Sequence, residues 1–106
     1  MNADEELVTK VIKKILTVAD PERIILFGSA ATGTQTFDSD LDLLVIKRGI
    51  IDHRHENVRL RSALAELGVP VDIFTMTPER FAETKDVFGG LAYPANKYGR
   101  VIYEAA

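Results

Sequence analysis

Two stretches of the sequence decide the expected fold: LFGSAATG at residues 26–33 and DSDLDLLV at residues 38–45. The apolar residues that lead into the first stretch predict a buried strand, which Gly28 and Ser29 end in a turn. Because glycine has no side chain, backbone N–H groups at such a turn can approach an anion closely. If Ser29 caps a short helix through Gly33, the free amides and the positive end of its dipole point to the same place. The turn therefore predicts a site of phosphate size.

The second stretch places two carboxylates at the start of another strand. Asp40 and Asp42 stand two residues apart where the apolar run Leu41 to Ile46 begins. Side chains at i and i+2 of a strand share one face, so both carboxylates are expected to point the same way. Two like charges there need a cation. Mg²⁺ is favoured because it takes hard oxygen ligands and is usually shared between carboxylates and substrate phosphates.

Each of these features alone is more often structural than functional. A Gly-Ser pair is usually only a turn, and an Asp-rich entry to a strand is usually a solvated edge. Two other motifs can be excluded. An EF-hand would need glycine where Leu43 stands and glutamate where Gly49 stands. A P-loop would need a Lys-Ser or Lys-Thr pair after the glycines, and none follows them.

A third acidic residue and two histidines are further candidates. Asp72 lies inside the apolar strand expected at Val69 to Met76, where a carboxylate is costly unless it is paired, hydrogen-bonded or metal-bound. Asp72 could also simply face solvent on an edge strand. His53 and His55 open a helix but are not side by side on its surface. For them a solvated helix start is favoured over a role in a site.

Composition narrows the class of protein. The 106 residues allow one domain, residues 1–106, with 46% hydrophobic and 27% charged residues as in ordinary globular proteins. The net charge of -3 argues against a general nucleic-acid groove, and the lack of cysteine excludes disulfides and thiolate metal sites. The N-terminus is acidic and no apolar run approaches membrane-spanning length, so we expect a cytoplasmic protein with no membrane partner.

Strands alternate with helices along the chain, which predicts an α/β or α+β fold. Strands are expected at Arg23 to Phe27, Leu41 to Lys47 and Val69 to Met76, and helices after the caps Asn2, Asp52 and Thr77. The second helix should turn inward Val58, Leu60, Ala63, Leu64 and Leu67, with Gly68 just past its end. We expect one small mixed sheet with helices packed mainly on one face.

The C-terminal third holds more large apolar side chains than a surface tail needs. Closure of the core is the favoured explanation, and a protein-binding face is the alternative. These residues are Phe81, Val87, Phe88, Leu91, Tyr93, Tyr98, Val101, Ile102 and Tyr103.

Taken together, a strand, Gly28-Ser29, a gap of ten residues and Asp40-Leu41-Asp42-Leu43 resemble the fingerprint of the nucleotidyltransferase superfamily that includes DNA polymerase β. More narrowly, the chain is similar to the minimal nucleotidyltransferases, single-domain proteins often paired with a HEPN-domain toxin. The resemblance runs along nearly the whole chain, including Asp72 and a closing GRVIYE segment. One departure is that Ala30 and Thr32 stand where family members commonly carry arginines.

The resemblance implies a nucleotidyltransferase fold and Mg²⁺-dependent transfer of AMP from ATP. Asp40, Asp42 and Asp72 would be catalytic and would hold two Mg²⁺ ions, while Gly28 and Ser29 would cradle the nucleotide phosphates. The acceptor would be a hydroxyl, most plausibly of a tyrosine, on a HEPN-type toxin for which this chain is the antitoxin.

Two alternatives stay open beside that function. The chain could transfer a nucleotide to a small molecule or an RNA end, although its short length disfavours a separate acceptor pocket. It could also be an antitoxin that only binds its partner, which the absent arginines would explain. The sequence leaves open which nucleotide is used and whether the chain forms homo- or hetero-oligomers.

Overall fold

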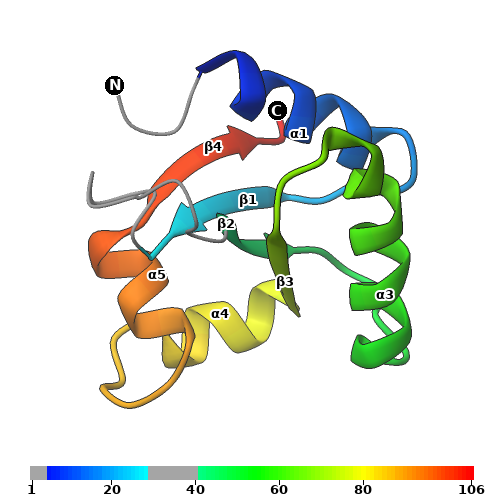
Figure 1. Ribbon diagram of the computed structural model, residues 1–106. Helices are drawn as coiled ribbons and strands as arrows, with labels where there is room; N and C mark the ends of the chain where they lie inside the picture. Colours follow the sequence, from blue (N-terminus) through cyan, green and yellow to red (C-terminus); the bar gives the residue numbers. More distant parts are fainter. Residues whose placement is uncertain (1–4, 29–40) are drawn as a thin grey trace.

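The computed structural model describes residues 5–28 and 41–106 and shows one sheet with helices on both of its faces (Figure 1). The expectations for Asn2, Ser29, Ala30, Thr32 and Asp40 therefore lie outside the described residues. The elements in chain order are α1 Glu5–Leu16, β1 Arg23–Phe27, β2 Leu41–Ile46, α3 His53–Leu64, a short 3-10 helix at Ala65–Leu67, β3 Val71–Met76, α4 Pro78–Thr84, α5 Ala92–Tyr98 and β4 Arg100–Glu104.

The sheet is mixed, as the sequence predicts. Its strand order is β3-β2-β1-β4, with β1 antiparallel to both β2 and β4. β2 and β3 are parallel, and α3 provides the crossover that a parallel pair requires. The central strands β1 and β2 are buried on both faces, which explains why their sequences are almost continuously apolar.

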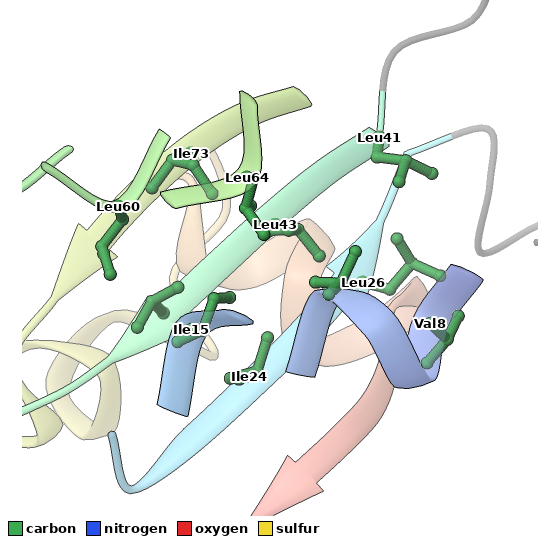
Figure 2. Close-up of a cluster of buried hydrophobic side chains, with 11 residues drawn as sticks. Val8, Ile15, Ile24, Leu26, Leu41, Leu43, Leu60, Leu64 and Ile73 are labelled. Atoms are coloured by element: carbon green, nitrogen blue, oxygen red, sulfur yellow. The ribbon is translucent and has the colours of Figure 1, made fainter. Parts of the chain in front are cut away.

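The larger core lies between the sheet and the two twelve-residue helices, α1 and α3 (Figure 2). On α1, Val8, Val11 and Ile15 repeat at helical spacing and form a single buried stripe. Alternate residues of each strand face these helices, because successive strand side chains point to opposite faces. The buried members of this core are Val8, Val11, Ile15, Ile24, Leu26, Leu41, Leu43, Val45, Leu60, Leu64 and Ile73.

A second core covers the opposite face. Ile25 and Phe27 of β1 and Leu44 and Ile46 of β2 pack there against Phe81 of α4 and against α5. The expected one-sided arrangement thus holds for the two long helices, while the two seven-residue helices cover the other face. From α5 only Ala92 and Ala95 are buried in this core, so the helix packs close to the strands.

The helix caps agree with the sequence prediction, whereas the position of one side chain on α3 does not. The Asp52 carboxylate accepts hydrogen bonds from the backbone N–H of Arg54 at 3.0 Å and of His55 at 3.3 Å, and Thr77 caps α4. Gly68 adopts the left-handed conformation after the helix, as a C-terminal glycine does. Val58 was expected to face inward, and that is wrong. It is half exposed, because the inward positions of α3 are set by Leu60 and Leu64.

The side chains of the C-terminal third divide between the core and the surface. Phe81 is buried, and Ile102 and Tyr103 pack against the larger core. Phe88 and Tyr98 are exposed, as are Val87 and Val101. None of the helices within the described residues is long and apolar enough to span a membrane.

An ion-paired carboxylate joins the end of β2 to α3. Glu56 lies 2.7 Å from Arg59 Nη2 and 3.1 Å from Lys47 Nζ, and the side chains of Lys47 and Glu56 are each only 12% exposed. The hydrogen bond from Arg59, followed by the one from Lys47, lowers the pKa of Glu56 from its ordinary 4.5 to about 2. The folded state therefore strongly favours the charged form.

Replacing Glu56 with glutamine should lower the free energy of unfolding at neutral pH by about 1–3 kcal/mol, because two half-buried cations lose their partner. The folded pKa is depressed, so this stability is fully present above pH 4.5 and is lost as the pH falls towards 2. Denaturant unfolding from pH 7 to 2.5 should show a shallower acid limb in Glu56→Gln. Glu6→Gln is the matched control, since its pair with Lys10 is exposed. Equal acid limbs for Glu56→Gln and the parent would contradict the assignment.

Gly99, where α5 turns into β4, has no room for a side chain. A Cβ there would overlap the Ala95 carbonyl oxygen and lie 2.7 Å from Ile25 Cγ2. Its φ of -79° is ordinary, so the constraint is purely steric. Gly99→Ala should therefore reduce the free energy of unfolding by about 1–3 kcal/mol. Gly90→Ala is the control, because a Cβ on Gly90 would have no atom within 4 Å; similar unfolding curves for the two variants would refute the close contact.

Candidate active site

Two of the predicted acids, Asp42 and Asp72, lie side by side on neighbouring strands. They are register partners in the parallel β2–β3 pair, and adjacent strands are spaced about 4.8 Å apart. Leu43 and Ile73, the next residues, face α1 and α3, so both aspartates point to the opposite face, the side of α4 and α5. Asp42 is half-buried and Asp72 is exposed. Residues thirty positions apart in the sequence thus form one acidic pair.

The turn at Gly28 lies against the same carboxylate. Gly28 has a φ of 73°, a conformation that residues with a side chain rarely adopt. A Cβ on Gly28 would overlap Asp42 Oδ2 and lie 3.2 Å from Asp42 Cγ. The sequence predicted that a missing side chain would admit an anion, and the structure adds that it also makes room for the aspartate. The turn and the acidic pair therefore lie together at one end of the sheet.

The remaining predicted residues lie outside the part of the chain that the structure describes. Ser29 and Asp40 belong to the interval 29–40, so their positions relative to Asp42 stay predictions. Asp40 directly precedes Leu41, the first residue of β2, and strand alternation would put it on the face of Asp42.

The described part of the site fits a divalent cation in its chemistry. Asp42 and Asp72 offer hard carboxylate oxygens on one face, and two like charges directly opposite each other on paired strands are unfavourable without a counter-charge. Within residues 5–28 and 41–106 no three metal-binding side chains are gathered together. The described residues therefore supply two of the three predicted ligands, and the third is Asp40.

Two aromatic rings that were not among the predicted site residues lie next to the acidic pair on the same face of the sheet. Phe27 is the register partner of Asp42 on β1, and Phe74 follows Asp72 by two residues on β3. Their ring centroids are 5.9 Å apart. The two rings therefore make the surface next to the acidic pair apolar. The sequence did contain a signal for Phe74, because a residue two positions after Asp72 on a strand lies on the same face of the sheet.

The histidines play no part in this site. His53 Nδ1 lies 2.9 Å from the hydroxyl of Thr75, which itself donates to Asn57 Oδ1 at 2.7 Å. Thr75 is on the α3 face of β3 and is buried, whereas His53 and His55 are exposed. The prediction of a solvated helix start is confirmed, and His53 in addition satisfies a buried hydroxyl.

A cavity of about 700 Å³ opens at the far end of the sheet, where β1 begins. Arg23 lines it together with Phe81 and Lys85 of α4, Asn96 of α5 and Glu104 of β4. Of the predicted site residues that the structure describes, Gly28, Asp42 and Asp72, none lines this cavity. The acidic pair is therefore a separate, open site.

The chain belongs to the nucleotidyltransferase domain family, because the model of that family matches residues 6–92, more than half of the chain. The matched region contains the Gly-Ser turn and all three predicted acids. No curated protein matches the chain significantly.

Solved structures show the same fold. A chain of a toxin–antitoxin crystal structure with AMP-PNP has a TM-score of 0.67 and 21% identity over 96% of this chain and 74% of that one. A chain of the MntA–HepT toxin–antitoxin structure has a TM-score of 0.66 and 18% identity over 96% and 74%. A chain from the complex of tri-AMPylated Shewanella oneidensis HEPN toxin with MNT antitoxin has a TM-score of 0.62 and 17% identity over 95% and 72%. The predicted nucleotidyltransferase fold is confirmed.

Gly28→Ala should disturb the site more than the fold. The added Cβ displaces the Asp42 carboxylate, and the positive φ costs about 1–2 kcal/mol. Gly49→Ala is a close control, since its φ is 74° but no atom lies within 4 Å of the new Cβ. Both variants should lose similar stability, whereas only Gly28→Ala should lose the rise in melting temperature produced by Mg²⁺ and ATP. If both variants keep that rise, the turn is not part of the nucleotide site.

Proposed function

We propose that this nucleotidyltransferase uses Mg²⁺ to transfer AMP from ATP to a tyrosine hydroxyl of a HEPN-type toxin, for which it is the antitoxin. The observation that carries the proposal is the register pairing of Asp42 with Asp72 beside Gly28, in a chain of this family. The structural neighbours support the choice of nucleotide and partner. One contains AMP-PNP, and another pairs an MNT antitoxin with an AMPylated HEPN toxin.

In this proposal the chain's own residues hold and orient the reactants. Gly28 and Ser29 would present backbone amides and a hydroxyl to the terminal phosphates. Asp40, Asp42 and Asp72 would hold two Mg²⁺ ions. When bound, the metal would neutralise phosphate charge and lower the pKa of the acceptor hydroxyl. Because Asp72 is the more exposed member of the described pair, it is the better placed to face an incoming acceptor.

The chemical step is a direct displacement. The acceptor oxygen would form a bond to the α-phosphorus of ATP while the bond from that phosphorus to the bridging oxygen breaks, and pyrophosphate leaves. The hydroxyl proton would pass to Asp72 as a general base. In this proposal the acceptor hydroxyl belongs to the toxin, so it would reach the acidic pair on the surface of that second protein.

A binding-only antitoxin is the second candidate, and one observation favours it. Ala30 and Thr32 stand where related sequences commonly carry arginine, the residue best suited to bidentate phosphate contacts. If the chain is nonetheless an enzyme, phosphate charge would be met by metal, amides and the Ser29 hydroxyl. Nucleotide binding should then depend strongly on Mg²⁺.

The test is co-expression with the product of the neighbouring open reading frame, which this proposal expects to be a HEPN-type protein. The parent chain should form a stable complex, and intact mass spectrometry should show one or more AMP units on the partner. Asp40→Asn with Asp42→Asn should keep the complex but leave the partner's mass unchanged, because ligands are lost without a change in the docking surface. Asp86→Asn, at an exposed carboxylate paired with Lys85, is the control and should transfer AMP as the parent does.

Two outcomes would reject the enzymatic proposal. Neutralisation of the toxin without any mass change, even by the parent chain, would establish the binding-only antitoxin. Absence of any complex would redirect the assignment to a small-molecule or RNA acceptor.

A further inference from the structure

Four neighbouring side chains on and before α5 form a group that we call the α5 surface: Phe88, Tyr93, Lys97 and Tyr98. Tyr93 is half-buried and the other three are exposed. Phe88 is 86% exposed and Tyr98 is 57% exposed, which is unusual for rings of this size. The Phe88 and Tyr93 rings meet edge to face, with centroids 5.5 Å apart. Such a group is held in place before any partner arrives.

Lys97 contacts both tyrosines of the α5 surface. Its Nζ lies 5.6 Å from the Tyr93 ring centroid and 5.5 Å from that of Tyr98, and donates a hydrogen bond to the Tyr93 hydroxyl at 3.2 Å. The Tyr93 hydroxyl also raises the pKa of Lys97, so the ammonium is charged at neutral pH. The surface is therefore an array of aromatic rings around one cation.

The local charge differs from that of the whole chain. Residues 87–100 contain no aspartate or glutamate, although the chain has 16 acidic residues and a net charge of -3. None of the ion pairs between described residues includes Lys97, while Arg100 at the end of this segment is paired with Glu5. The α5 surface is thus positive and aromatic, and its complement is an acidic group set among apolar side chains.

The α5 surface is held next to the acidic pair by the fold. Ala92 and Ala95 pack α5 directly onto β1, and Gly99 is so close to that strand that an added Cβ would lie 3.1 Å from the Leu26 carbonyl oxygen. Figure 1 shows α5, in orange, beside the carboxyl end of β1, the end from which the chain enters Gly28. A molecule bound along α5 is therefore kept at the end of the sheet that carries Asp42 and Asp72.

We propose that the α5 surface is the docking site for the acceptor-bearing HEPN-type protein, which places a carboxylate opposite Lys97. The inference rests on the proposed function and names the surface that this function requires. Aromatic side chains dominate the energy of protein interfaces, and opposite charge sets the orientation of the partner. Single-stranded nucleic acid also stacks on aromatic rings, but it requires a cationic groove that a chain of net charge -3 with one central lysine does not offer.

Binding of the full chain to the purified HEPN-type protein should be measured by calorimetry. The double variant Phe88→Ala with Tyr98→Ala should weaken the dissociation constant by about tenfold or more. Lys97→Glu should weaken it similarly, while Lys97→Arg should retain most of the affinity because the charge is kept. Ile51→Ala is the matched control, since Ile51 is 99% exposed on the loop before α3 and should bind as the parent does.

A second measurement separates this inference from the proposed function. None of the varied side chains belongs to the acidic pair, so every variant should keep the rise in melting temperature with Mg²⁺ and ATP. Unchanged partner binding by the α5 variants, with AMP still transferred, would overturn the docking site and leave the function intact. No complex with the parent chain would overturn both. Loss of single-stranded RNA binding, or of a self-dimer in sedimentation, without loss of partner binding would assign the surface to that ligand instead.

Discussion

The in-register parallel pairing of β2 with β3 is the constraint on which the site depends. It places Asp42 beside Asp72, and like charges directly opposite each other on paired strands are destabilising. The pairing persists because the same register buries Leu43 and Ile73 beneath α3. A slip of one residue would move Asp72 to the α3 face and expose Ile73, so the packing of the large core specifies the acidic pair. The fold stabilises an arrangement that its charges alone would oppose.

Local signals in the sequence predicted the elements well. The strand Arg23–Phe27 follows from its apolar run, and the helix starts at Asp52 and Thr77 follow from capping that needs only neighbouring residues. Helix α5 was not among the helices expected from the sequence, and it contains a proline, Pro94. Proline is tolerated in the first turn, where its missing N–H has no intrahelical acceptor, and that is where Pro94 lies.

What the sequence could not supply is spatial. The three aspartates could be selected as a set only through the family fingerprint. The sequence between residues 42 and 72 does not indicate which strands are neighbours in the sheet. Strand order likewise determines the close approach of Gly28 to Asp42 and the contact between the Phe27 and Phe74 rings. The side chains of the C-terminal third divided between core and surface for the same reason. Ala92 and Ala95 are the residues of α5 that pack against β1, and the larger side chain of Tyr98 is exposed.

The absence of space at Gly99 has a consequence for how fast a bound acceptor could react. Because a Cβ on Gly99 would meet Ile25 and the Leu26 carbonyl, the backbone at the end of α5 packs closely on β1, and close packing resists displacement of the helix along the strand. A molecule held on α5 would therefore bring its hydroxyl to a fixed place, with a high effective molarity and few further degrees of freedom to lose. In that case the orientation of the acceptor would be set when the molecule docks.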